Sequence, residues 1–226
     1  MKKKLNRSIF FLFFLLLFSL FISVSCKKKS QFFPENLIKV RVKKVLDGDT
    51  VILENGERLR YVSIDTPELH TSKNVLYIFA FSAYKLNKKL VEGKTFYLEL
   101  SIRKRDKYGR LLGELYFENG TSVSEIIIKE GLAFVCYYPG SSKYYKKYLP
   151  LQRKALKERK GIFSLLTKQP KDIVYIGNKK SKRFHHPACP EAKKIKRKIY
   201  FKSLEEAFLK GYCPSRKCLD LIFSFL

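Results

Sequence analysis

The folded part of the chain begins with a pattern typical of β-strands. Apolar and polar residues alternate from Ile38 to Val45, and a short apolar run, 51–53, follows the Asp-Gly-Asp-Thr stretch at 47–50. Asn55-Gly56 then predicts a tight turn into a third run, 59–64. This order predicts a sheet that starts with a β-hairpin.

Helix-like spacing dominates later in the chain. Three segments have apolar residues recurring near every 3.6 positions, which predicts helices at 78–91, 123–130 and 144–160. Strand-like runs at 95–100 and 111–116 separate the first two helices. Pro150 lies inside the last predicted helix and predicts a kink or a separate first turn. Strands and helices therefore occur together in one α+β domain.

The N-terminal segment, 1–26, has the pattern of an export signal. Basic residues precede an apolar run, 9–24, that ends at Ser25-Cys26. Sixteen residues extend only ~24 Å as a helix, less than the ~30 Å hydrocarbon core. The segment resembles a bacterial lipoprotein signal, in which Cys26 becomes the lipidated first residue. Ser23 stands where that pattern favours Leu, so an uncleaved anchor is the alternative.

Both interpretations predict an extracytoplasmic protein. The polar stretch 27–35 is then a tether between the anchor and the folded domain. We expect the protein in the cell envelope, attached to a membrane by lipid or by the uncleaved signal, or secreted.

Charge narrows the choice of partners. The 226 residues include 47 Lys and Arg against 20 Asp and Glu, a net charge of +27. Residues 1–30, 31–171 and 172–226 have net charges of +7, +12 and +8. With 19 Phe and 14 Tyr the chain is not disordered, and one long apolar run excludes a multi-span membrane protein. The balance favours polyanionic partners, against the alternative of a solubilising lysine-rich surface.

Acidic residues at the strand ends indicate a cation site. Asp49 begins one strand, and Asp65-Thr66-Pro67-Glu68 follows the next. Three neighbouring carboxylates repel one another unless a cation lies among them, and hard oxygen ligands suit Ca²⁺ or Mg²⁺. Arg60 and Arg110 add guanidinium groups, whose planar donors match phosphate oxygens.

Four segments give this region a resemblance to the staphylococcal nuclease (thermonuclease-like) family. They are VLDGDTVIL at 45–53, RYVSIDTPE at 60–68, DKYGR at 106–110, and Gly131-Leu132-Ala133 with Tyr137. The resemblance spans about residues 36–166. It implies a five-stranded OB-type β-barrel with about three helices, in a domain over 36–168.

The resemblance also implies a role for each matched residue. The calcium ligands would be Asp49, Asp65 and the Thr66 carbonyl, with Asp47 just behind them. Arg60 and Arg110 would be the phosphate-binding arginines. Glu68 would be the general base, or the group that orients the attacking water. The nucleotide pocket would contain Lys107, Tyr108 and Tyr137. The implied activity is Ca²⁺-dependent hydrolysis of DNA and RNA that leaves 3′-phosphates.

Residues 172–226 form a separate region, the C-terminal module, with short strand-like runs and a compact cluster of His and Cys residues at 184–189 and 211–218. On these segments, residues 173–219 resemble the Ada-type metal-binding domain. The expected zinc ligands are His185, Cys189, Cys213 and Cys218. Ser215 stands where that pattern has a cysteine, so two alternatives remain open: a disulfide among the three cysteines, or no metal. Cys136, in the apolar stretch 133–137, is expected to be a buried thiol.

Two functions compete with the nuclease interpretation. One is a non-catalytic nucleic-acid-binding or uptake lipoprotein with the same fold, and such degenerate domains typically lose metal-binding carboxylates or arginines. The other is adhesion through host polyanions, which predicts salt-sensitive binding that does not depend on Glu68. The complete set of matched acidic and arginine residues favours catalysis. No protein partner is predicted.

Overall fold

The computed structural model describes residues 36–71, 74–170 and 172–225, which belong to one compact unit. The predicted signal or anchor segment 1–26, with Cys26, and the tether 27–35 lie outside the described residues. Among the residues that are described, none of the helices has both the length and the apolar content that a membrane span requires.

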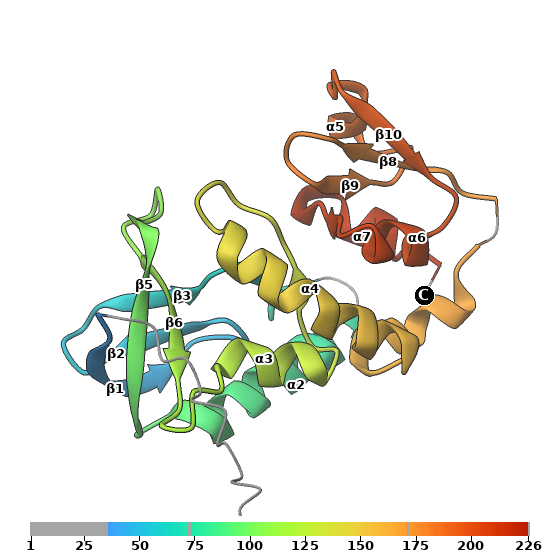
Figure 1. The fold of residues 1–226 in the computed structure, drawn as a ribbon. Helices are drawn as coiled ribbons and strands as arrows, with labels where there is room; N and C mark the ends of the chain where they lie inside the picture. Colours follow the sequence, from blue (N-terminus) through green and yellow to red (C-terminus); the bar gives the residue numbers. More distant parts are fainter. Residues whose placement is uncertain (1–35, 72–73, 171, 226) are drawn as a thin grey trace, which may run out of the picture. The chain divides into compact units, whose positions relative to one another are not determined.

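Five strands close into a barrel in the order β1-β2-β3-β6-β5 (Figure 1). They are β1 (Ile38–Val45), β2 (Thr50–Leu53), β3 (Arg58–Tyr61), β5 (Thr95–Arg105) and β6 (Leu111–Tyr116). Every pair in the barrel is antiparallel except β3 with β6. The predicted five-stranded barrel is therefore confirmed.

Three helices follow the predicted order. They are α2 (Asn74–Val91), α3 (Val123–Lys129) and α4 (Ser142–Lys157). The last ends three residues before its predicted end, because Arg159 and Gly161 adopt positive φ angles of 53° and 52°. The chain then continues in a 3₁₀ segment, η1 (Gly161–Lys168). Because α4 is continuous through Pro150, the separate first turn that was predicted as one alternative is absent.

The barrel core is mainly aliphatic and also contains buried aromatic rings, among them Phe96, Tyr61 and Tyr148. Alternate residues of β1 and β2, such as Val42 and Val51, point inward and are fully buried. Ile127 of α3 and Tyr148 of α4 pack against them. Burial of one face of each strand and helix thus explains the two periods in the sequence.

The C-terminal module forms a second sheet, in the order β10-β8-β9-β11. Its strands are β8 (Tyr175–Asn178), β9 (Arg183–His185), β10 (Lys198–Phe201) and β11 (Cys213–Pro214). Its helical segments are α5 (Pro190–Lys193), α6 (Leu204–Leu209), η2 (Arg216–Cys218) and α7 (Leu219–Ile222). Only β9 and β11 run parallel.

The C-terminal module shares an aromatic core with the preceding elements. Phe134 lies on β7 (Phe134–Val135), which pairs with β4 (Ile64–Asp65). Its ring stacks on Phe208 of α6 at 5.4 Å between centroids, and Phe163 of η1 packs edge-on against the same ring. One continuous cluster of buried side chains therefore joins the module to the region around α4.

Candidate active site

Two buried aspartates meet at one edge of the barrel. Asp49 directly precedes β2, and its carbonyl accepts a hydrogen bond from the Tyr61 N–H at 2.9 Å. Asp65 ends β4, and each aspartate side chain is only 4% exposed. Arg60 lies between them, with Nη2 at 3.0 Å from Asp49 Oδ2 and 2.9 Å from Asp65 Oδ1. The structure thus brings together three residues that the sequence assigns to one site.

The Asp-Gly-Asp-Thr turn fixes Asp49. The Asp47 carboxylate accepts a hydrogen bond from the Asp49 N–H at 2.9 Å, as short acidic side chains commonly do in turns. A Cβ on Gly48 would lie 2.7 Å from the Thr66 hydroxyl oxygen, so glycine permits this close approach. Thr66 donates its N–H (2.9 Å) and its hydroxyl (3.2 Å) to Asp49 Oδ2. Thr66 therefore orients one proposed calcium ligand.

The two aspartates have opposite pKa shifts. Burial raises the pKa of Asp49 to about 6, although the charge of Arg60 acts against this. Burial acts on Asp65 in the same direction, but hydrogen bonds and charge from Arg216, with Arg60 and Arg183, hold the pKa of Asp65 below its ordinary value. Asp65 is therefore the carboxylate that stays charged most readily.

The donor set fits a hard divalent cation. Asp49 and Asp65 provide carboxylate oxygens, which Ca²⁺ prefers over nitrogen or sulfur. The positively charged Arg60 Nη2 lies within 3.0 Å of both carboxylates, which shows that this position attracts a cation. Asp49 and Asp65 are consequently the residues that would hold Ca²⁺.

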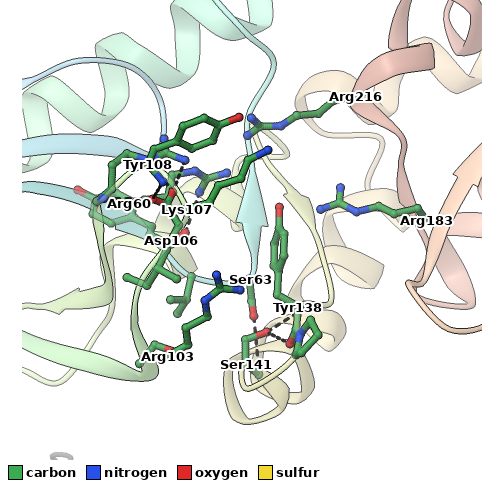
Figure 2. A pocket seen from close by; sticks show the side chains of 16 residues that line it. Arg60, Ser63, Arg103, Asp106, Lys107, Tyr108, Tyr138, Ser141, Arg183 and Arg216 are labelled. Atoms are coloured by element: carbon green, nitrogen blue, oxygen red, sulfur yellow. Dashed lines mark hydrogen bonds and ion pairs between the residues drawn. The ribbon is translucent and has the colours of Figure 1, made fainter.

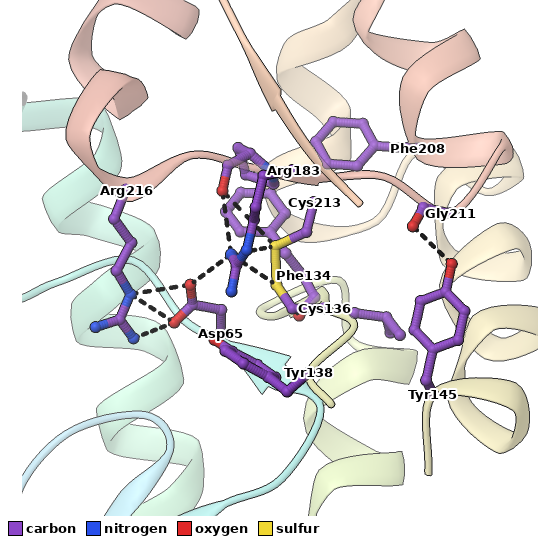
Figure 3. Close-up of a disulfide and its surroundings, with 12 residues drawn as sticks. Asp65, Phe134, Cys136, Tyr138, Tyr145, Arg183, Phe208, Gly211, Cys213 and Arg216 are labelled. Atoms are coloured by element: carbon purple, nitrogen blue, oxygen red, sulfur yellow. Dashed lines mark hydrogen bonds and ion pairs between the residues drawn. A yellow bond between two sulfur atoms is a disulfide. The ribbon is translucent and has the colours of Figure 1, made fainter. Parts of the chain in front are cut away.

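Glu68 lies at the open side of this pair. Its side chain is 51% exposed, and Oε1 lies 3.0 Å from Arg216 Nη1. Arg216 also donates from Nε to both carboxylate oxygens of Asp65 at 2.9 Å, and from Nη2 to Oδ1 (Figure 3). One guanidinium therefore contacts two members of the carboxylate cluster, which we define as Asp49, Asp65 and Glu68.

A cavity of about 390 Å³, which we call the arginine cavity, opens beside the carboxylate cluster (Figure 2). Its basic lining residues are Arg60, Arg103, Lys107, Arg110, Arg183 and Arg216. Asp106 is the single acidic lining residue, and Tyr108 and Tyr138 contribute aromatic rings. Basic groups beside aromatic rings suit phosphates beside nucleobases.

The turn between β5 and β6 holds Arg110 in the cavity wall. Asp106 Oδ1 accepts hydrogen bonds from the N–H groups of Tyr108 (2.9 Å) and Arg110 (3.1 Å). Asp106 Oδ2 accepts another from Arg110 Nε at 2.8 Å. Because Gly109 adopts a φ of 79°, the chain reverses here without strain. Lys107 and Tyr108, predicted from the same motif, also line the cavity.

Tyr137 does not join this cavity. Its ring packs edge-on against Tyr145, with 5.6 Å between centroids, whereas Tyr138 lines the cavity instead. Both tyrosines follow β7, outside any helix or strand, so the local path of the chain decides which ring faces the cavity. A shift of one position therefore exchanges the tyrosine that faces the cavity.

The structure adds Arg183 and Arg216 to the site. Arg183 lies on β9 and Arg216 on η2, and they contact Asp65 across 118 and 151 residues of sequence. No local motif marks either residue. Each can be recognised as a site residue only from the folded structure, in which the C-terminal module packs beside the barrel.

The cysteines correct two predictions. Cys136 forms a disulfide with Cys213, so the prediction of a buried thiol was wrong. Cys213 is thereby removed from the predicted zinc set, because the packing of β11 beside β7 directs it toward Cys136. The other pair, Cys189–Cys218, also forms a disulfide, one of the open alternatives.

Three of the predicted zinc ligands remain together. His185 Nδ1 lies 3.5 Å from both Cys189 Sγ and Cys218 Sγ. Burial lowers the pKa of His185, which favours the neutral imidazole. A structural zinc site needs four ligands with free thiolates, so the disulfide-bonded arrangement does not fit the metal.

Comparisons place this architecture of barrel, aspartates and arginines in a known class. Residues 58–165 match the model of the staphylococcal nuclease homologue family. The chain is 32% identical to the thermonuclease of Staphylococcus intermedius over 126 residues, which cover 54% of this chain and 74% of that protein. The chain belongs to the staphylococcal nuclease family.

Two relatives from Bacillus subtilis (strain 168) are longer than the region of similarity. Endonuclease YncB is 36% identical over 135 residues, covering 58% of this chain and 64% of that protein. The SPbeta prophage-derived endonuclease YokF is 37% identical over 135 residues, covering 58% and 45%. The family match ends at residue 165, before the C-terminal module.

Proposed function

We propose that the protein is an extracytoplasmic, calcium-dependent nuclease that hydrolyses phosphodiester bonds in DNA and RNA and leaves 3′-phosphates. The observation that carries this proposal is the position of the buried Asp49–Asp65 pair beside a cavity lined by Arg60 and Arg110. The endonucleases and the thermonuclease similar to this chain support the same class of reaction.

Each side chain has a distinct task in this proposal. Glu68 is half-exposed at the open side, where its carboxylate can accept a proton from the attacking water. Arg60 and Arg110 present planar donors to the phosphate, whose negative charge increases in the transition state. Ca²⁺, when bound by Asp49 and Asp65, would supply further stabilisation of that charge.

We also propose that the protein is attached to a membrane and faces away from the cytosol. The export pattern of residues 1–26 and the lipoprotein-like Cys26 support this location. The disulfides Cys136–Cys213 and Cys189–Cys218 support it independently, because disulfides persist mainly in oxidising compartments.

Cleavage of single-stranded DNA by the purified full chain, with Ca²⁺ or with a chelator, tests the activity. Glu68→Gln should lower the rate by about 10²-fold or more because it removes the base. Arg110→Ala should lower it by about 10²–10³-fold because it removes a donor to the developing charge. Arg58→Ala is the matched control, since Arg58 is exposed on β3 and is not a lining residue of the cavity.

Two results would contradict the proposal. If the chain binds DNA in a salt-sensitive manner but never cleaves it, the uptake or binding function is favoured instead. If Arg58→Ala and Arg110→Ala reduce cleavage equally, general charge rather than the site determines the rate.

A further inference from the structure

Two arginines of the C-terminal module form part of the cavity wall. Arg216 points toward Tyr108 and Arg60, whereas Arg183 points toward Tyr138 (Figure 2). The family match ends at residue 165, so both arginines lie outside it. The C-terminal module therefore contributes two residues to the cavity wall from outside the matched segment 58–165.

The backbone around Arg216 is held in place on both sides. Arg216 begins η2, between Cys213 and Cys218, each of which is in a disulfide. The N–H of Ser215 donates to the Phe184 carbonyl at 2.8 Å. The side chain, by contrast, is 46% exposed, so its guanidinium can change partners while its Cα stays fixed.

Arg183 is more buried than Arg216, with 18% of its side chain exposed, and most of its contacts lie within the C-terminal module or on Tyr138. Its guanidinium lies over the Tyr138 ring, 4.9 Å from the centroid, and Nη1 donates to Cys213 Sγ at 2.9 Å and to the Pro214 carbonyl at 3.3 Å. Its contact with Asp65 Oδ2 is longer, at 3.4 Å (Figure 3). Of the two arginines, Arg216 is the more exposed, and its contacts with Asp65 and Glu68 are the ones that a bound cation would compete for.

Charge balance shows what Arg216 would do when a cation binds. In the structure, the carboxylate cluster is matched by three guanidiniums, those of Arg60, Arg183 and Arg216. A divalent cation at Asp49 and Asp65 would leave an excess of positive charge beside the cavity. A phosphate group, with oxygens that accept guanidinium donors in pairs, would restore the balance.

We propose that Arg216 is a third phosphate-binding arginine of the nuclease site, bound to Asp65 and Glu68 until Ca²⁺ takes its place on Asp65. This inference rests on the proposed function. It makes two predictions of opposite sign. Arg216 competes with Ca²⁺ in the absence of substrate, and it strengthens substrate binding when Ca²⁺ is present.

Arg216→Ala tests both predictions in the full chain. The Kd for Ca²⁺, measured by titration calorimetry without nucleic acid, should fall about tenfold, because a charge-assisted competitor is lost. With saturating Ca²⁺, the KM for a fluorogenic single-stranded DNA should rise about tenfold, and kcat should change much less. Arg216→Lys keeps the charge but cannot bridge two carboxylates, so both values should lie between those of wild type and Arg216→Ala.

Lys217→Ala is the matched control. Lys217 is the next residue, carries the same charge and is paired with Glu191 at 3.6 Å, outside the carboxylate cluster. Both constants should stay within about twofold of wild type, as expected for a weak surface pair.

The possible outcomes separate this inference from the proposed function. If Arg216→Ala has the same Kd for Ca²⁺ or the same KM for DNA as Lys217→Ala, the inference is wrong. In particular, a lower Kd for Ca²⁺ with an unchanged KM would mean that Arg216 only blocks the cation site. If the wild-type chain does not cleave DNA at all, the proposed function itself fails.

Discussion

Glu114 is the buried acid whose titration should affect stability most directly. Its carboxylate accepts hydrogen bonds from the Ser124 N–H (3.1 Å), the Ser124 hydroxyl (2.5 Å) and the Tyr148 hydroxyl (2.8 Å). Burial nevertheless raises the pKa of Glu114 from 4.5 to about 7. The folded chain therefore keeps a proton that the unfolded chain releases, and the free energy of unfolding should fall as pH rises from about 4.5 through 7.

The full shift corresponds to about 3 kcal/mol, and Glu114→Gln should remove it, because glutamine resembles the protonated acid and does not titrate. Urea unfolding of both proteins at pH 5 and pH 8 measures the effect. Relative to the variant, the wild type should lose about 2–3 kcal/mol between these values, because part of the full effect is already lost below pH 5. If the free energy of unfolding changes equally in the two proteins between pH 5 and pH 8, Glu114 does not titrate in this range.

The site residues divide according to how far apart in sequence their partners lie. Residues next to strand ends or turns were predicted from local motifs, and the structure brings five of them to one region: Asp49, Arg60, Asp65, Glu68 and Arg110. Arg216 was not predicted, because its contact with Asp65 depends on tertiary packing across 151 residues. The choice of Tyr138 over Tyr137 depends on the local path of the chain after β7, which the sequence pattern does not specify.

At the scale of elements, one close contact joins the end of α3 to the start of η1. Gly131 has a φ of +68°, and a Cβ there would lie 2.2 Å from the Lys160 carbonyl oxygen. The Gly131 carbonyl accepts a hydrogen bond from the Ile162 N–H at 3.0 Å. Gly56 offers a comparison, because its φ is +84° but nothing lies within 4 Å of its Cβ position.

We expect Gly56→Ala to lower the free energy of unfolding by about 1–2 kcal/mol, the usual penalty for an L-residue in the left-handed region. Gly131→Ala should lower it by at least about 2 kcal/mol more, because backbone atoms must also move apart. Chemical denaturation of both variants provides the comparison. Equal losses would show that the contact between α3 and η1 relaxes without penalty.

The longer helices and strands, in which apolar residues recur at a regular spacing, were predicted well. The barrel strands and α2, α3 and α4 all occur where the periodicity indicates, with ends that differ by a few residues. The short strand β7 lies within the apolar stretch 133–137 that indicates a strand, and β4 overlaps the end of the predicted run 59–64. The strand β11 was not specified, because two residues have no measurable period. The pairing of all three strands is decided by tertiary packing, and it is this pairing that places Asp65 near the C-terminal module.

At the scale of the whole molecule, the Cys136–Cys213 disulfide joins the C-terminal module to the barrel region. It connects residues 77 positions apart, one directly after β7 and one on β11. The Cys136 N–H donates to the Ser63 carbonyl at 2.8 Å. Ser63 is two positions before Asp65 in the sequence, so the disulfide lies beside the segment that carries Asp65. The covalent link and the site therefore share the same short stretch of backbone.

Removing this link should affect both stability and substrate binding. Cys136→Ser with Cys213→Ser should lower the free energy of unfolding by about 2–4 kcal/mol, because the unfolded chain loses a long loop constraint. The KM for single-stranded DNA should rise as in Arg216→Ala, since the arginines of the C-terminal module are then held only by non-covalent packing. Denaturation and steady-state kinetics measure the two effects, and an unreduced wild-type sample is the reference. If the double-serine variant has the same free energy of unfolding and the same KM for single-stranded DNA as this reference, the shared aromatic core alone holds the module in place.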